Sequence, residues 1–203
     1  MDDNDHGESP VVGLLLAAGG GRRLGGRPKA LLPHHGRPLV EHAARALREG
    51  GCERVFVVLG AAADEVRARA ALPGCVLVDN PRWASGMGSS LRAGLASLTT
   101  GQAYGAALVM LVDQPGIGPA AVARVRTAYR SPGTLAAASY GGERGHPVLF
   151  GADHWARIAA DATGDQGARG YLRSHAREIV LVECGDVAEP YDIDTEEDLS
   201  HLE

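Results

Sequence analysis

One stretch near the N-terminus decides the fold: Val11–Lys29, with the sequence VVGLLLAAGGGRRLGGRPK. Its first six residues form a continuous apolar run, which is typical of a strand buried on both faces of a parallel sheet. A glycine-rich loop follows and carries four cations, Arg22, Arg23, Arg27 and Lys29. Because successive glycines leave backbone N–H groups unshielded, this loop is expected to bind a polyphosphate.

Outward from this stretch, apolar strands and amphipathic helices alternate through most of the chain. Strands are expected at residues 11–16, 55–59, 75–78, 106–112, 135–140, 147–150 and 178–183, and helices at 38–47, 64–71, 86–98, 119–130, 153–160, 168–175 and after Thr195. This alternation predicts right-handed βαβ units with helices on both faces of the sheet. A glycine-rich turn joins the strands at 135–140 and 147–150, so one strand should be antiparallel. The predicted fold class is α/β: a Rossmann-like three-layer sandwich with a mostly parallel sheet and one antiparallel strand.

Composition limits the classes of protein. The chain has 203 residues, of which 45% are hydrophobic and 22% charged, as in ordinary globular proteins. Its net charge of −5 argues against nucleic-acid binding. Its three cysteines form no C-x-x-C pair, so neither a disulfide framework nor a zinc site is expected. We expect a flexible acidic tail at residues 1–10 and a single domain at 11–203. With neither a signal peptide nor a membrane span in view, the expected location is cytoplasmic.

The glycine-rich loop departs from two common nucleotide-binding motifs. Ala30 follows Lys29 where a Walker A loop has Ser or Thr. Leu24 stands where a dinucleotide fingerprint needs its third glycine, so nicotinamide chemistry loses its main support. Lys29 is also the only lysine among 20 basic residues, which suggests a position where arginine does not serve. The alternative is a flexible, solvated arginine-rich loop.

The loop has the pattern L-A-A-G-x-G-x-R-x-G followed by lysine, which resembles nucleotidyltransferases that make activated nucleotide diphosphates. More narrowly, the chain resembles the molybdenum-cofactor cytidylyltransferases among the MobA-like NTP transferases. That resemblance extends over Asn80-Pro81, Gly86–Leu91, Asp113–Pro115, Gly145–Val148, Gly164–Arg169 and Asp192–Thr195. It implies the nucleotide-diphospho-sugar transferase fold. The chain departs from the family pattern by one extra residue between Gly25 and Lys29.

The resemblance also implies roles for individual residues. The catalytic residues would be Lys29, Arg23 and Asp113. Mg²⁺ would be held by Asp113 and Asp194, with Asp192 as a helper. The acceptor side would include His146 and Arg169. The nucleotide would contact Leu16, Ala17, Ala18, Gly19, Gly21, Arg23, Lys29, Gly86, Gly88 and Ser90.

Each role has a structural alternative. Ser90 could cap the helix that it precedes. Asp113 could shape the turn before Pro115, and His146 could be a hydrogen-bonded turn residue. Asp194 could support the N-terminus of the last helix through its dipole.

The expected function is Mg²⁺-dependent transfer of CMP from CTP to a phosphorylated acceptor, molybdopterin or molybdenum cofactor, with release of pyrophosphate. A guanylyltransferase acting on molybdopterin, or a transferase for another small phosphorylated acceptor, would use the same chemistry. A non-enzymatic chaperone that delivers the cofactor is a further alternative. Expected partners are the substrates and a molybdoenzyme or maturation factor, with neither nucleic acid nor membrane involved.

Overall fold

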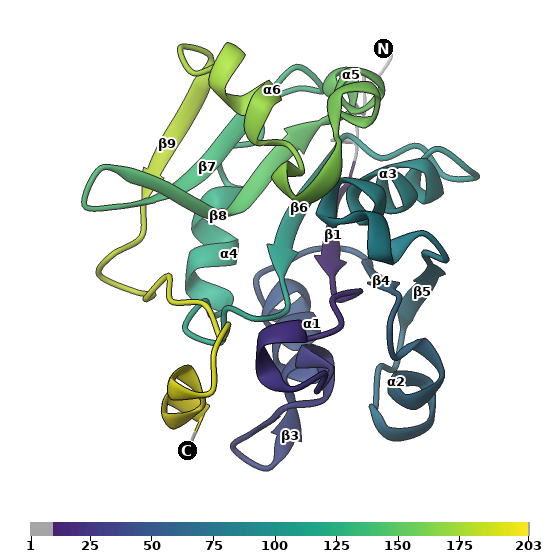
Figure 1. Cartoon of the computed structure of the whole chain (residues 1–203). Coiled ribbons are helices and arrows are strands. Elements are labelled where there is room, and N and C mark those ends of the chain that lie inside the picture. Colours follow the sequence, from purple (N-terminus) through teal and green to yellow (C-terminus); the bar gives the residue numbers. More distant parts are fainter. Residues whose placement is uncertain (1–9, 203) are drawn as a thin grey trace, which may run out of the picture.

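The computed structural model describes residues 10–202, so the first nine residues of the expected acidic tail lie outside the described part. A seven-stranded sheet runs through the molecule in the order β5-β4-β1-β6-β8-β7-β9 (Figure 1). The strands are β1 (Val11–Leu16), β4 (Val55–Leu59), β5 (Cys75–Asp79), β6 (Ala106–Leu111), β7 (Leu135–Tyr140), β8 (Glu143–Gly151) and β9 (Ile179–Glu183).

The pairing confirms a mostly parallel sheet. β1 lies inside the sheet, parallel to both neighbours β4 and β6, and all six of its residues are buried. β8 runs antiparallel to its neighbours β6 and β7, whereas β7 is parallel to β9. In the described sheet β8 is therefore the one antiparallel strand, as the glycine-rich turn before it predicts.

Helices cover both faces of the sheet and complete the three layers. The core on one face receives α1 (Leu39–Glu49), α2 (Ala63–Arg69) and α4 (Pro119–Arg126). The core on the other face receives α3 (Met87–Leu98), α5 (Trp155–Asp161) and α6 (Arg169–Ser174). Leu15 of β1 packs into the first core and Leu14 into the second, because successive strand residues point to opposite faces. The predicted three-layer α/β fold is confirmed.

Some element boundaries differ from the sequence prediction. α4 ends at Arg126 although residues 127–130 keep a helical spacing, because the N–H groups of Ala128 and Tyr129 bond to carbonyls three residues back and no longer four. A small hairpin of β2 (Pro33–His34) and β3 (Arg37–Pro38) was not expected, since two-residue strands are too short to show alternation. The last helix is a 3₁₀ helix, η6 (Glu197–Leu202).

The arrangement gathers several loops at one edge of the sheet. In Figure 1 the arrows of β1 and β6 point to the same end of the molecule, where the C-terminal segment also lies. A backbone hydrogen bond of 2.9 Å from the Ile193 N–H to the Asp113 carbonyl anchors that segment beside the end of β6. Within residues 10–202, no helix is long and apolar enough to cross a membrane.

Candidate active site

Two adjoining pockets open at this edge of the sheet. The loop pocket, of about 450 Å³, lies between the glycine-rich loop, the segment Trp83–Met87 and the carboxylates of Asp113 and Asp194. The hairpin pocket, of about 390 Å³, lies under the β7–β8 hairpin and α6. Leu16, Met87 and Leu111 line both pockets, so a ligand in one can reach a ligand in the other.

Gly21 closes the glycine-rich loop on itself. Its carbonyl accepts hydrogen bonds from the N–H groups of Leu24 and Gly26, at 2.9 and 3.0 Å. Its φ of 60° is in the left-handed region, and a Cβ there would lie 1.9 Å from the Arg27 carbonyl oxygen. Leu24 is fully buried and anchors the loop to the core. Gly21 therefore sets the shape of the loop and does not itself line the pocket.

Lys29 joins the two carboxylates of the loop pocket. Its ammonium donates to Asp113 Oδ2 at 2.7 Å and makes a short hydrogen bond to Asp194 Oδ1. The Arg23 guanidinium lies 3.9 Å from the other oxygen of Asp194. The Lys29 side chain is only 15% exposed, so it is not the freely solvated side chain that an arginine-rich loop suggests. The extra residue in the loop leaves Lys29 at the carboxylates.

Burial and charge perturb both members of this pair. Burial alone lowers the pKa of Lys29, but the neighbouring carboxylates of Asp113 and Asp194 outweigh it and raise the pKa overall. Burial raises the pKa of Asp113, although Lys29 pulls it down. Lys29 is therefore firmly protonated, and its charge is what compensates a carboxylate that is costly to bury.

Asp113 and Asp194 are suitable ligands for a divalent metal. Within residues 10–202, no group of three or more His, Cys, Asp or Glu side chains is arranged to hold a metal ion. Mg²⁺ is commonly held by one or two carboxylates together with substrate phosphates and water, which this pair fits. Asp192 faces the hairpin pocket instead, where it accepts a 2.7 Å hydrogen bond from Gln114 Nε2.

Asp194 does not serve the last helix. The carboxylate of Asp198 accepts hydrogen bonds from the N–H groups of Asp194 and Thr195, at 3.0 and 2.7 Å. The Asp194 carboxylate faces Lys29 and Arg23 instead. The alternative role of Asp194 as a helix support therefore loses its geometric basis.

The start of α3 forms the opposite wall of the loop pocket. Gly86, at φ 103°, and Gly88 lie so close to residues 162–165 that a Cβ on either would approach within 3.0 Å of that backbone. Ser90 is 5% exposed and lines the loop pocket. Because neither glycine has a side chain, the start of α3 can pack directly against the segment before α6. This close packing fixes where Ser90 lies.

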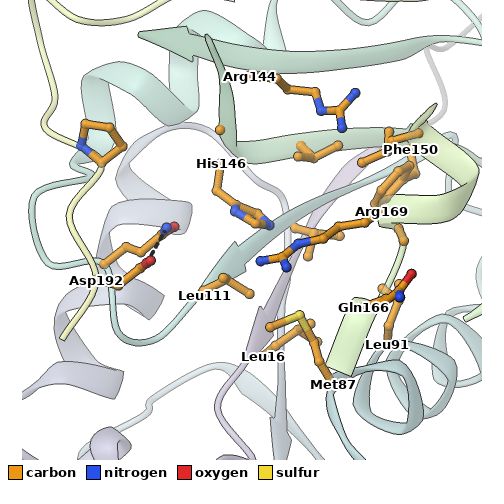
Figure 2. Close-up of a pocket in the computed structure, with 18 of the residues that line it drawn as sticks. Leu16, Met87, Leu91, Leu111, Arg144, His146, Phe150, Gln166, Arg169 and Asp192 are labelled. Carbon is orange, nitrogen blue, oxygen red and sulfur yellow. Dashed lines mark hydrogen bonds between the residues drawn. The ribbon is translucent and has the colours of Figure 1, made fainter. Parts of the chain in front are cut away.

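The hairpin pocket combines an apolar wall with two arginines. Figure 2 shows the Arg169 guanidinium reaching across the pocket toward the His146 ring, while Arg144 comes from the hairpin strand. Burial, together with the charges of Arg169 and Arg144, lowers the pKa of His146 to about 4. His146 is therefore neutral near pH 7, and the charged side chains that line the pocket are Arg144 and Arg169 together with Glu143 and Asp192.

The structure brings most of the predicted site residues to these two pockets. Those that line the loop pocket are Leu16, Ala18, Gly19, Arg23, Lys29, Gly86, Ser90, Asp113 and Asp194. His146 and Arg169 line the hairpin pocket. Three others lie behind the walls: Ala17 in the core beneath the loop, Gly21 within the loop, and Gly88 against Thr163.

Sequence reasoning missed several lining residues. In the loop pocket these include Trp83, and in the hairpin pocket Tyr140, Glu143 and Arg144. Asp165 and Gln114 also line the pockets, and they lie within recognised motifs although the resemblance gave them no site role. Trp83 lies between two recognised motifs, and Arg144 lies beside another. Position next to a motif is therefore the only signal in the sequence that could have found them.

Comparison with known proteins identifies the family of this chain. The family model described as MobA-like NTP transferase domain matches residues 13–179. The chain belongs to the MobA-like NTP transferase family. The resemblance inferred from the motifs is thereby confirmed at the level of the family.

Relatives within this family carry different activities in their names. Nicotine blue oxidoreductase of Paenarthrobacter nicotinovorans is 44% identical over 199 residues, which cover 95% of this chain and 96% of the relative. Molybdenum cofactor guanylyltransferase of Xanthomonas euvesicatoria is 46% identical over 50 residues, 25% of this chain and 26% of the relative. Membership of the MobA-like family therefore does not by itself fix the substrate.

One structurally similar protein has been solved with a metal ion. The manganese complex of Rv0371C from Mycobacterium tuberculosis has a TM-score of 0.76 and 29% identity, covering 96% of this chain and 98% of that one. A neighbour of nearly the same extent has thus been solved in complex with manganese.

Proposed function

We propose that this protein is a metal-dependent nucleotidyltransferase that moves CMP from CTP to a phosphorylated acceptor, molybdopterin in the first instance. The observation that carries the proposal is the contact of Lys29 with both Asp113 and Asp194 beside the glycine-rich loop. This arrangement supports the proposal because it brings positive charge and carboxylate oxygens next to the loop that is expected to bind a triphosphate. The hairpin pocket next to it would hold the acceptor.

The reaction forms one bond and breaks one bond. An oxygen of the acceptor phosphate attacks the α-phosphorus of CTP, and the bond from that phosphorus to the pyrophosphate oxygen breaks. Lys29 and Arg23 would neutralise the negative charge that spreads over the phosphates, and the loop N–H groups would orient them. Bound by Asp113 and Asp194, Mg²⁺ would supply further charge neutralisation. Such a transfer needs no covalent nucleophile from the protein.

The hairpin pocket fits an acceptor that is flat and anionic. Val148, Phe150 and Leu91 offer apolar contact. Arg144 and Arg169 can pair with a phosphate, and the lining carboxylates of Glu143 and Asp192 can accept hydrogen bonds from ring N–H groups. The neutral ring of His146 can donate or accept a hydrogen bond without adding charge. These features support an acceptor with a ring system and a phosphate, which is the chemistry of molybdopterin.

The choice of CTP rests on the Ala-Ala opening of the loop and on the start of α3. Ala18 gives the loop pocket a small wall, and Ser90 can hydrogen-bond a base. A pyrimidine suits this space. Guanylyl transfer is the alternative within the same chemistry.

A matrix of the four nucleoside triphosphates against molybdopterin and other phosphorylated acceptors tests the proposal, with pyrophosphate release as the readout. We expect CTP with molybdopterin to give the highest kcat/KM, and Lys29→Ala to abolish most of it. A higher value with GTP would replace cytidylyl by guanylyl transfer. Nucleotide binding without pyrophosphate release from any pair would favour a delivery chaperone.

One observation favours a second candidate function. The relative at 44% identity is named an oxidoreductase, and it matches nearly the whole chain. In this reading a flat oxidised ring binds the hairpin pocket and accepts a hydride from a reduced nicotinamide nucleotide in the loop pocket. Leu24, where the dinucleotide fingerprint has glycine, argues against it. Oxidation of NADH or NADPH with a quinone-type dye, followed by absorbance, distinguishes the two candidates.

A further inference from the structure

The strand β9 forms one outer edge of the sheet, next to β7 (Figure 1). Among residues 10–202, the exposed large apolar side chains are those of Val180 and Leu181, at 51% and 50%, and both lie on this strand. Its five residues contain neither lysine nor proline, which often protect an edge strand from pairing with another chain. β9 therefore offers an apolar strand to solvent.

The backbone groups of β9 point alternately toward β7 and outward. The N–H of Cys184, directly after the strand, donates to the Ser139 carbonyl of β7 at 2.8 Å. Because backbone groups of successive strand residues point to opposite sides, the even-numbered residues of β9 face β7 and the odd-numbered residues face outward. Among the described residues, none bonds to the outward N–H and C=O groups of Ile179 and Leu181. These groups are therefore available to another strand.

The open stretch ends at Glu183. Its outward carbonyl accepts a 2.9 Å hydrogen bond from Arg124 of α4, so pairing cannot easily continue beyond it. Its carboxylate accepts hydrogen bonds from Ser139 Oγ and from the N–H groups of Gly141 and Gly185, at 2.9, 3.1 and 3.0 Å. A carboxylate has roughly four lone-pair sites, so this exposed group can also pair with a cation from outside.

The residues of one face of β9 follow a self-complementary order. Arg177 lies in the turn just before the strand, and Ile179, Leu181 and Glu183 follow at every second position. Read against itself in the opposite direction, this order pairs arginine with glutamate and isoleucine with leucine. Within residues 10–202 no ion pair engages the exposed Arg177 guanidinium, so its charge is available for such a pairing.

The position of a two-fold axis decides which residues meet. On such an axis two strands can pair antiparallel only about a residue, because side chains that lie opposite each other share a face of the sheet. An axis at Val180 sets Ile179 opposite Leu181 of the second copy, where the two exchange both backbone hydrogen bonds, and brings Arg177 to Glu183. An axis at Leu181 would set Ile179 opposite Glu183, and one at Ile179 would set Arg177 opposite Leu181. Only the axis at Val180 matches charge with charge.

We propose that β9 is an interface between two copies of this chain, whose β9 strands pair antiparallel about Val180 and join the two sheets into one. The occupant is a second copy because the order of side chains on one strand supplies both members of every pair. The pairing covers the apolar side chains of Val180 and Leu181 and satisfies the outward backbone groups. It goes beyond the proposed function, since it requires neither nucleotide nor acceptor.

The oligomeric state tests the interface. Sedimentation velocity over a wide range of protein concentration should show a dimer for the wild type. We expect the dissociation constant of Arg177→Glu to rise by about tenfold or more, because two cross-strand pairs change from attraction to repulsion. Leu181→Lys, which places a charge among the apolar contacts, should be monomeric. Arg157→Glu on α5 is the matched control, because it makes the same charge change on another exposed surface and should dimerise like the wild type.

A cross-link tests the position of the axis. The backbone groups of Val180 face β7, so the two copies of this residue form a non-hydrogen-bonded pair with Cα atoms about 4.5 Å apart, which a disulfide can bridge. We expect Val180→Cys to form a covalent dimer on oxidation. Leu181→Cys is the matched control, because its two copies are displaced along the strands. The wild type, with free Cys52, Cys75 and Cys184, gives the background.

Three outcomes would overturn the proposal. A wild type that is monomeric at every concentration rejects a second copy as the occupant and leaves the edge to a segment of another protein. A dimer that neither Arg177→Glu nor Leu181→Lys weakens must form through another surface. A cross-link that forms at residue 181 and not at residue 180 rejects the axis at Val180. None of these measurements depends on nucleotidyl transfer, so they stand or fall separately from the proposed function.

Discussion

The ammonium of Lys29 lies 2.7 Å from the Asp113 carboxylate, although 84 residues separate them in sequence. Lys29 follows the glycine-rich loop, and Asp113 follows β6. The same ammonium also contacts Asp194. In the protein without nucleotide, Lys29 therefore pairs with both carboxylates proposed to hold the metal, and a triphosphate that binds beside it would offer a third anionic partner.

Replacing Lys29 by alanine should affect both catalysis and stability. We expect kcat to fall by about 10²–10³-fold, because a charge that stabilises the transition state is removed. The free energy of unfolding should fall too, by about 1–3 kcal/mol, because Asp113 is left buried without its partner. Steady-state pyrophosphate release and urea unfolding measure the two effects.

Lys29→Arg provides the matched control. Arginine keeps the positive charge, so this variant should be nearly as stable as the wild type. Its planar guanidinium, however, does not reproduce the geometry of a compact ammonium between two carboxylates. We expect kcat to stay well below that of the wild type. Full activity in folded Lys29→Ala would remove Lys29 from the reaction.

Asp113→Asn and Asp194→Asn should each raise the Mg²⁺ concentration needed for half-maximal activity and lower kcat. Each change removes a carboxylate charge from the proposed metal ligands. Asp198→Asn is the control, because it contacts the Asp194 backbone but not Lys29. A magnesium titration checks all three. A wild-type curve for either of the first two variants excludes that residue as a ligand.

His146 should make stability depend on pH. Its folded pKa of about 4 lies below the ordinary value of 6.5, so folding favours the neutral ring. The contribution is complete above pH 6.5 and is lost as the pH falls toward 4. Between pH 7.5 and 4.5 the wild type should lose about 2 kcal/mol more than His146→Gln, which cannot titrate. Urea unfolding at both pH values measures this, and equal losses would contradict it.

Gly21→Ala should weaken nucleotide binding far more than Gly25→Ala. Both glycines have left-handed backbone, at φ 60° and 64°, so alanine costs about 1–2 kcal/mol of backbone strain at either. Only at Gly21 does a Cβ also meet the Arg27 carbonyl, whereas open space surrounds the Cβ of residue 25. We expect CTP affinity to fall by about tenfold or more in Gly21→Ala, because the clash with the Arg27 carbonyl forces the loop to change its shape. Similar affinities for the two variants would show that the loop shape does not matter.

Most of the fold could be predicted from local patterns. The six apolar residues of β1 and the alternation after them predicted a buried parallel sheet, and the structure confirms it. The turn before Glu143 predicted the antiparallel strand. These predictions succeed because a strand buried on two faces needs a continuous run of apolar residues, and a tight turn needs glycines at adjacent positions. Both requirements are visible in a short stretch of sequence.

The composition of the site could be predicted in part. The motifs indicated Lys29, Asp113 and Asp194, and all three line the loop pocket. No pattern indicated Arg144. Each segment that passes a pocket contributes only one or two side chains to its wall, so the lining residues form no continuous motif. Nor did a pattern indicate that Ala17 and Gly88 lie behind the walls, since only packing decides which way a loop residue faces.

By itself, the sequence determined the order of the elements, the glycines that bend the loop, and the residue types available for phosphate and metal. Only the tertiary structure decided which of them meet. The hydrogen bond from Ile193 to Asp113 brings the C-terminal segment to the end of β6 and so puts Asp194 within reach of Lys29. The contacts of Asn80 with Ser89 and Ser90 arise in the same way. Such contacts depend on distances across the folded chain, and spacing along the sequence does not contain them.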